Sequence, residues 1–160
     1  MPIYIKIEGI DGDVTQAKYK GWIDCESLQW GVGRAVMTPV GSTMNREASA
    51  PTLSELTFTK TMDRSTATIL QETCSGEAGK KVTVEMMTTA NPPKTYMKYE
   101  LEDALLSGYS CSGASGGGRP SESVSLNFTK ITTTYTVSDE KGNDLTSLSA
   151  HFDVTEGKAG

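Results

Sequence analysis

The sequence predicts a mainly β protein: a curled antiparallel β-barrel or sandwich of six to seven strands with one α-helix. Three observations support this fold class. Thr and Ser contribute 21 and 16 of the 160 residues, and Thr favours strands. Short segments in which apolar and polar residues alternate recur along most of the chain. Three of these segments change phase partway, as strands do where a sheet bends.

The first two strands are predicted near the N-terminus. Residues 3–8 place isoleucine at every second position, so one face of this strand is apolar. A second strand is predicted over residues 21–32. Its second half carries Leu28 and Trp30 on one face and Ser27 and Gln29 on the other. Its first half has the opposite phase, which predicts a bulge or bend near Glu26.

Residues 33–52 are predicted to form a long loop, because they contain two prolines and no sustained period. Loops longer than about 12 to 15 residues are uncommon in compact domains and are usually functional or disordered. Four apolar residues of this loop are better covered by a partner than left in water. They are Val36, Met37, Val40 and Met44.

A third strand at residues 56–60 precedes the helix. Asp63 is a predicted cap, and Gly76 is placed to end the helix. Ala67, Leu70 and Cys74 form the predicted apolar stripe at positions i, i+3 and i+7.

The remaining strands follow the helix. Residues 82–86 form a fourth strand, and residues 95–109 form a fifth with a bend at 103–106. Residues 122–137 read as a sixth strand with a change of phase after Phe128. A last short strand is predicted around Phe152 and Val154.

Composition excludes several classes of function. The net charge of −5 and the lack of clustered Lys and Arg argue against a nucleic-acid-binding protein. No apolar run approaches the length of a membrane span, and the alternating N-terminus is unlike a signal peptide. Three dispersed cysteines predict a reducing compartment. Only 29 residues are Leu, Ile, Val or Phe, so the core is thin and predicts help from a neighbouring subunit.

No catalytic or metal-binding constellation is predicted. His151 is the only histidine, lies in a polar tail and is interpreted as an ordinary surface residue. Trp22 and Trp30 are interpreted as core or interface anchors rather than sugar-stacking platforms, because apolar residues are scarce. We therefore expect neither an enzyme nor a cofactor.

Seven sequence blocks in order resemble the haemolysin-coregulated protein (Hcp) family of bacterial type VI secretion. The resemblance extends from about residue 3 to 145, whereas residues 33–52 and the tail from 143 to 160 match only in character. The blocks are Tyr4-Ile-Lys-Ile-Glu-Gly-Ile-Asp-Gly12, Gly21-Trp-Ile-Asp24, Trp30-Gly31, Leu56-Thr-Phe-Thr-Lys60 with Asp63-Arg-Ser-Thr66, Cys74-Ser-Gly76, Tyr99-Glu-Leu-Glu-Asp103, and Glu122-Ser-Val-Ser-Leu-Asn-Phe-Thr-Lys-Ile131 with Tyr135.

The resemblance implies one Hcp-like β-barrel domain over residues 1–160 that assembles into a homohexameric ring with a wide channel. Rings would stack into a tube, which a contractile sheath drives out of the cell behind a spike protein. The chain would be made in the bacterial cytoplasm, leave it without a leader, and carry small effectors in the channel. It would bind no nucleic acid and insert into no membrane.

The resemblance also assigns positions. The residue before the Trp30-Gly31 pair is expected to face the channel, so Gln29 is a predicted wall residue with Ser27 beside it; the alternative is an outer-surface glutamine. Residues 33–52 would reach a neighbouring subunit or the next ring. Asn91, Pro92 and Glu156 are the predicted ring-stacking rim. A different class of function, a monomeric ligand-binding β-domain for a carbohydrate, remains an alternative that a size measurement separates from the tube.

Overall fold

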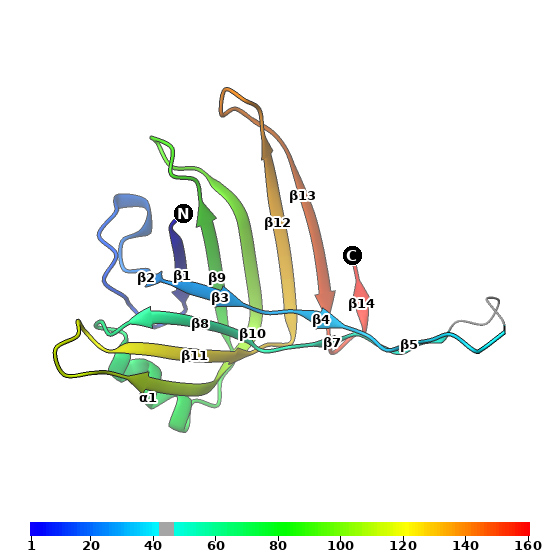
Figure 1. Ribbon diagram of the computed structural model, residues 1–160, viewed down its shortest axis with the longest axis horizontal. Helices are drawn as coiled ribbons and strands as arrows, with labels where there is room; N and C mark the ends of the chain where they lie inside the picture. The colour runs from blue at the N-terminus through cyan, green and yellow to red at the C-terminus, as the bar shows by residue number, and fades with distance from the viewer. Residues whose placement is uncertain (42–46) are drawn as a thin grey trace.

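The structure is a computed structural model that describes residues 1–41 and 47–160. Two antiparallel layers cross each other, and an arm extends from one side (Figure 1). The elements in chain order are β1 (Ile3–Ile7), the 3-10 helix η1 (Ala17–Tyr19), β2 (Ile23–Cys25), β3 (Ser27–Gln29), β4 (Val32–Gly33), β5 (Val36–Met37), β6 (Glu47–Ala48), β7 (Thr52–Leu53), β8 (Leu56–Thr61), α1 (Thr66–Ser75), β9 (Lys80–Met87), β10 (Thr95–Ser112), β11 (Ser121–Asn127), β12 (Lys130–Ser138), β13 (Asp144–Asp153) and β14 (Lys158–Ala159).

The first layer runs β2-β1-β9-β10-β12-β13-β14, and the second runs β3-β8-β11 and continues into the second half of β10. The two layers join at two corners. At one corner β10 bends near Asp103, whose φ is 53°, and its pairing with β9 shifts register between Leu101 and Ala104. At the other, the chain leaves β2, which pairs with β1, and enters β3, which pairs with β8. The predicted phase changes near Glu26 and residues 103–106 are therefore confirmed as points where the chain changes layer.

Apolar side chains from both layers and from α1 meet in one core. Alternation sets this packing, because Ile3, Ile5 and Ile7 are buried while Tyr4 and Lys6 are only partly so. The buried apolar cluster comprises Ile3, Ile5, Ile7, Ile10, Ile23, Cys25, Leu56, Phe58, Ile69, Val82, Val84, Leu101, Ala104, Leu106, Val124, Leu126, Phe128 and Ile131. Leu28 and Trp30 pack against its edge, and the Trp30 ring meets Tyr99 edge-on at 5.6 Å between centroids. Trp30 is thus an anchor of the core edge, as predicted.

Two predicted strands have different bounds in the structure: one is divided into two strands and the other is longer. Residues 122–137 form β11 and β12, which pair with different halves of β10, so the phase change after Phe128 is a change of layer. The last strand is longer than predicted, because β13 spans ten residues and pairs along β12, and β14 then returns against its end. The sequence did not reveal β13 because eight of its ten residues are exposed.

The predicted apolar stripe of the helix is wrong. Ile69 is the buried residue of α1, whereas Leu70 is 48 % exposed and Ala67 and Cys74 are also exposed. The N-cap position is Ser65, and Asp63 contributes from outside by accepting a hydrogen bond from the Ser65 backbone N–H at 2.9 Å. Gly76 ends the helix as predicted, and its N–H donates to the Glu72 carbonyl at 2.8 Å.

Residues 33–52 are not an irregular loop in the part that the structure describes. Val32 and Gly33 of β4 pair with Leu53 and Thr52 of β7, and β5 pairs with β6 farther out. We call residues 32–53 the arm. Its strand β5, to which β6 is paired, projects beyond β14 and away from the two layers (Figure 1). Met44 lies outside the described residues.

Candidate channel-facing surface

Gln29 and Ser27 point away from the core, on the face of β3 opposite to Leu28. Both side chains are exposed, whereas Leu28 is half-buried against the core. The cause is the alternation of a strand: burying Leu28 gains ~1.5 to 3 kcal/mol, so the neighbouring polar residues take the other side. The orientation predicted for Gln29 and Ser27 is what the structure has. Their position in a channel stays a prediction.

A neutral surface continues from these two residues across the second layer. The pairing places Ser27 opposite Thr59, Thr59 opposite Ser123, and Ser123 opposite Ser110. Directly paired residues share a face, so this row crosses four strands on the side away from the core. We call the whole surface the hydroxyl face. It comprises Ser27, Gln29, Thr57, Thr59, Thr61, Gly108, Ser110, Ser112, Ser121, Ser123, Ser125 and Asn127, with the exposed Leu105 paired to Asn127 at its border.

Every member of the hydroxyl face is neutral, and several bond to one another. Ser27 Oγ and Thr59 Oγ1 are 2.5 Å apart, and Thr57 Oγ1 and Ser125 Oγ are 3.3 Å apart. The buried positions between them, such as Phe58 and Val124, hold the face in place from below. The surface therefore offers hydroxyl donors and acceptors from uncharged side chains, and at its edge the Thr61 hydroxyl donates to the carboxylate of Glu26.

Sequence reasoning found two of these residues and missed the others. The alternation of Ser or Thr with buried residues in 56–61 and 121–127 was a visible signal. This alternation does not indicate which strands are neighbours in the sheet, because β3, β8 and β11 lie far apart in the sequence and the arm separates β3 from β8. Pairing alone brings their hydroxyls onto one surface.

A buried ionic cluster lies beneath the end of this layer. Lys60 and Glu122 are fully buried and form an ion pair, and Lys60 Nζ also lies 2.9 Å from Asp63 Oδ1. Thr66 Oγ1 donates to Glu122 at 2.9 Å, and Tyr109 donates its phenolic proton to the same carboxylate. Burial first, then this bond to Glu122, raises the pKa of Tyr109. Within the described residues no buried side-chain nitrogen or oxygen lacks a hydrogen-bond partner, and the bonds of this cluster attach α1 to the layer.

The other singled-out residues do not gather with the hydroxyl face. Val36, Met37 and Val40 are 46 %, 70 % and 105 % exposed on the arm. Asn91 and Pro92 are exposed in the loop between β9 and β10, and Glu156 is exposed in the turn between β13 and β14. Because β9 runs antiparallel to β10, β10 to β12 and β12 to β13, these two segments lie at opposite ends of the first layer.

Catalytic and metal-binding candidates are also dispersed. His151 is exposed on β13, far along the sheet from the hydroxyl face. Within residues 1–41 and 47–160, no group of three His, Cys, Asp or Glu side chains is placed to hold a metal ion. Trp22 packs edge-on against Tyr19 at 5.0 Å rather than standing free. In the same described part of the chain, no helix is long and apolar enough to cross a membrane.

Comparison with known proteins agrees with this architecture. The family described as "Type VI secretion system effector, Hcp" matches residues 4–135. A solved type six secretion system protein is 26 % identical, with 99 % of each chain covered and a TM-score of 0.93. Hcp1 from Salmonella typhimurium is 26 % identical over 99 % of this chain and 97 % of that one, with a TM-score of 0.80.

More distant structures share the fold. A type VI secretion system effector from Yersinia pestis is 24 % identical over 95 % of this chain and 99 % of that one, with a TM-score of 0.75. A search among curated proteins gives no significant match. These relatives give no support to the alternative of a monomeric carbohydrate-binding domain. The family match covers most of the chain and the fold agrees throughout: the chain belongs to the Hcp family of secreted proteins and is a subunit of the type VI secretion tube.

Proposed function

We propose that six copies of this single-domain chain close into a ring whose channel is lined by the hydroxyl face. The observation that carries this proposal is the neutral surface shared by β3, β8, β11 and β10, which stands opposite to the core. A contact between two different patches of the same chain closes into a ring when its rotation closes. Each subunit would then present Gln29 and Ser27 to the lumen.

The chemistry of the hydroxyl face suits a surface along which different proteins are carried. A charged wall would bind cargo of opposite charge and repel cargo of like charge. Uncharged hydroxyls form hydrogen bonds with many partners and strong attractions with none. We infer that small effectors are held in the ring by shape and weak polar contacts, and that the wall itself performs no catalysis and needs no cofactor.

Rings would stack through their two ends. The loop with Asn91 and Pro92 and the turn with Glu156 are exposed and lie at opposite ends of the first layer, which suits head-to-tail contact between rings. The arm, with its exposed Val36 and Met37, would add contacts to a neighbouring copy. A stacked tube of this kind would fit a spike at its tip and a contractile sheath around it. It would assemble in the bacterial cytoplasm and then be expelled from the cell.

Sedimentation of the purified chain tests the ring. We expect a species about six times the 17.1 kDa of the chain, and rings with a central hole in negative-stain images. A chain that remains monomeric at all concentrations would refute the ring. A compact hexamer without a central hole would refute the proposed channel, whereas the proposed hexameric state would stand.

A further inference from the structure

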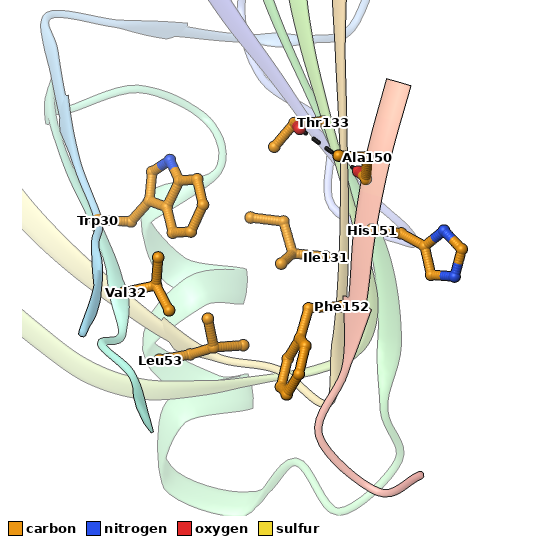
Figure 2. Close-up of a pocket in the computed structure, with 8 residues that line it drawn as sticks. All are labelled: Trp30, Val32, Leu53, Ile131, Thr133, Ala150, His151 and Phe152. Atoms are coloured by element: carbon orange, nitrogen blue, oxygen red, sulfur yellow. Dashed lines mark hydrogen bonds between the residues drawn. The ribbon is translucent and has the colours of Figure 1, made fainter. Parts of the chain in front are cut away.

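The two ends of the hydroxyl face differ in chemistry. At the end that carries Gln29, the next side chain is Trp30, which is directed into an apolar cavity together with Ile131 and Phe152 (Figure 2). The imidazole of His151 lies beside this cavity and points away from it. The cavity therefore brings no charged group to this end of the face.

The opposite end of the face carries a carboxylate. Glu26 comes directly before β3, and its backbone N–H donates to the Thr59 carbonyl at 2.8 Å. The Glu26 side chain is exposed and accepts a hydrogen bond from the hydroxyl of Thr61. Thr61 is the last residue of β8 and is paired with Ser121, the first residue of β11. Glu26 therefore places its carboxylate at the edge of the hydroxyl face, beside its last row.

Three basic side chains lie in this region, and none of them is paired with Glu26. Arg64 Nε contacts Asp13 Oδ1 at 2.7 Å, and Lys60 is fully buried in the ionic cluster. Arg119 borders the same cavity of about 180 Å³ as Glu26. Within the described residues, Glu26 forms no ion pair with these three bases or with any other. Its charge can therefore attract a cation from outside the chain.

The pKa of Asp24 reflects the charge balance beside Glu26. Burial first, then the carboxylates of Glu26 and Asp63, raise this pKa above its ordinary 3.8. Both charged groups that shift the pKa of Asp24 are acidic, so the nearby guanidinium groups do not neutralise this end of the face.

In the proposed ring, each subunit contributes one Glu26 to the channel, so six carboxylates border a neutral wall. A hollow surface lined by charge of one sign concentrates groups of the opposite sign, and rings of Asp or Glu select cations in ion channels. We propose that Glu26 gives the channel a preference for protein cargo whose contacting segment is rich in Lys or Arg. The inference rests on the proposed ring and names the class of cargo that the ring carries.

The neutrality of the hydroxyl face allows one carboxylate per subunit to decide this preference. The hydroxyls of Ser27, Thr59 and Ser123 form hydrogen bonds with acidic and basic segments alike. Glu26 attracts a basic segment and repels an acidic one, over a distance of ~8 Å at physiological salt. The preference for basic cargo should therefore weaken with added salt, whereas the contacts to the hydroxyls should not.

Peptide binding to assembled rings tests the preference. One fluorescent peptide alternates Lys with Ser, and a second peptide of the same length carries Glu in place of Lys. Glu26→Gln removes the charge and keeps an oxygen that accepts from the Thr61 hydroxyl. The matched control is Glu140→Gln, which removes the same charge from an exposed turn between β12 and β13. Sedimentation first establishes that each variant forms rings.

The charge at position 26 should decide which peptide binds. We expect wild-type rings to prefer the Lys peptide, and Glu26→Gln to weaken binding of that peptide about fivefold, or ~1 kcal/mol. Glu140→Gln should leave the affinity unchanged. Glu26→Lys should reverse the preference, and salt at about 1 M should abolish it.

Equal losses in Glu26→Gln and Glu140→Gln would attribute the preference to the net charge of the ring. A loss caused instead by Glu55→Gln, which removes the exposed carboxylate just before β8, would place the selecting group at the other end of the face. Wild-type rings that bind both peptides equally would have no preference. Each of these results would overturn the inference while the ring proposal stands. A chain that never assembles would instead refute the ring, and the inference with it.

Discussion

The ammonium group of Lys60 lies against the carboxylate of Glu122 in the core, with both side chains fully buried. The pair connects β8 to β11, and its neighbours Asp63 and Thr66 connect both strands to the start of α1. Removing one member leaves the other charge buried without its partner. This is more damaging than removing both, because the penalty comes from the uncompensated charge.

Lys60→Met should therefore destabilise the fold by ~3 to 5 kcal/mol. The double variant Lys60→Met with Glu122→Gln should recover part of that loss. Urea unfolding at one fixed protein concentration measures both, since assembly adds to apparent stability. The single variant Glu122→Gln completes the comparison. If the destabilisation of the double variant equals the sum of the destabilisations of the two single variants, the two residues are not energetically coupled.

Gln29→Arg should leave the ring intact and reduce the amount of bound effector several-fold. The side chain is exposed and contributes nothing to the core, but the substitution places a charge on a neutral wall. Sizing measures the ring, and co-purification measures the cargo. Ser149→Arg, an exposed position on β13, adds the same charge away from the hydroxyl face and should change neither quantity. Unchanged cargo for several effectors, or a collapsed ring, would remove Gln29 from the channel wall.

Deletion of residues 36–44 should abolish tube formation while the two layers stay folded, because none of the described residues of this segment, 36–41, belongs to the core. Circular dichroism tests the fold, and electron microscopy tests the tubes. A second variant, Val36→Ser with Met37→Ser and Val40→Ser, keeps the length of the arm and removes its apolar contacts. Normal tubes from the deletion variant would exclude the arm from assembly.

Cysteines at Asn91 and Glu156 should crosslink stacked rings, because these residues lie at opposite ends of the first layer and would meet head to tail. The measurement uses a background in which Cys74 and Cys111 are replaced, and compares concentrated tubes with dilute single rings. Crosslinks should appear only in the tubes. If no pair drawn from residues 90–94 and 153–158 crosslinks, the rim lies elsewhere.

Asp24→Asn should stabilise the fold at neutral pH. Partial burial, and then the carboxylates of Glu26 and Asp63, raise the pKa of Asp24 above its ordinary 3.8. A raised folded-state pKa in an acid means that ionisation opposes folding, so stability falls as the pH rises through the range just above 3.8. The carboxyl is well exposed, so solvent screening keeps the gain below ~1 kcal/mol. Thermal unfolding from pH 4 to 7 should show the gain at pH 7 and its loss toward pH 4.

The matched control for this effect is Glu140→Gln, which removes one charge in the turn between β12 and β13. A gain of equal size in both variants would attribute the effect to net charge. A gain for Asp24→Asn that persists at pH 4 would show that its cause is not the ionised carboxyl.

The alternation of the sequence by itself determined the strand faces. Isoleucines at every second position buried one side of β1, and Leu28 on the inner side of β3 left Gln29 outside. The phase changes near Glu26, near residue 103 and after Phe128 marked bends, because a strand that passes between layers must change which side meets the core. These are local properties, and a single sequence carries them.

Only the tertiary structure decided which strands are neighbours and what lies on the uncovered sides. The hydroxyl face exists because β3, β8, β11 and β10 pair in register, a matter of contacts between distant segments. The inner side of α1 follows from its packing against β10 and the apolar core, which buries Ile69 and leaves Leu70 exposed. The length of β13 came from pairing with β12, since its exposed side chains carry no apolar pattern. Backbone pairing uses groups common to every residue, so sequence patterns record it only where a side chain must also be buried.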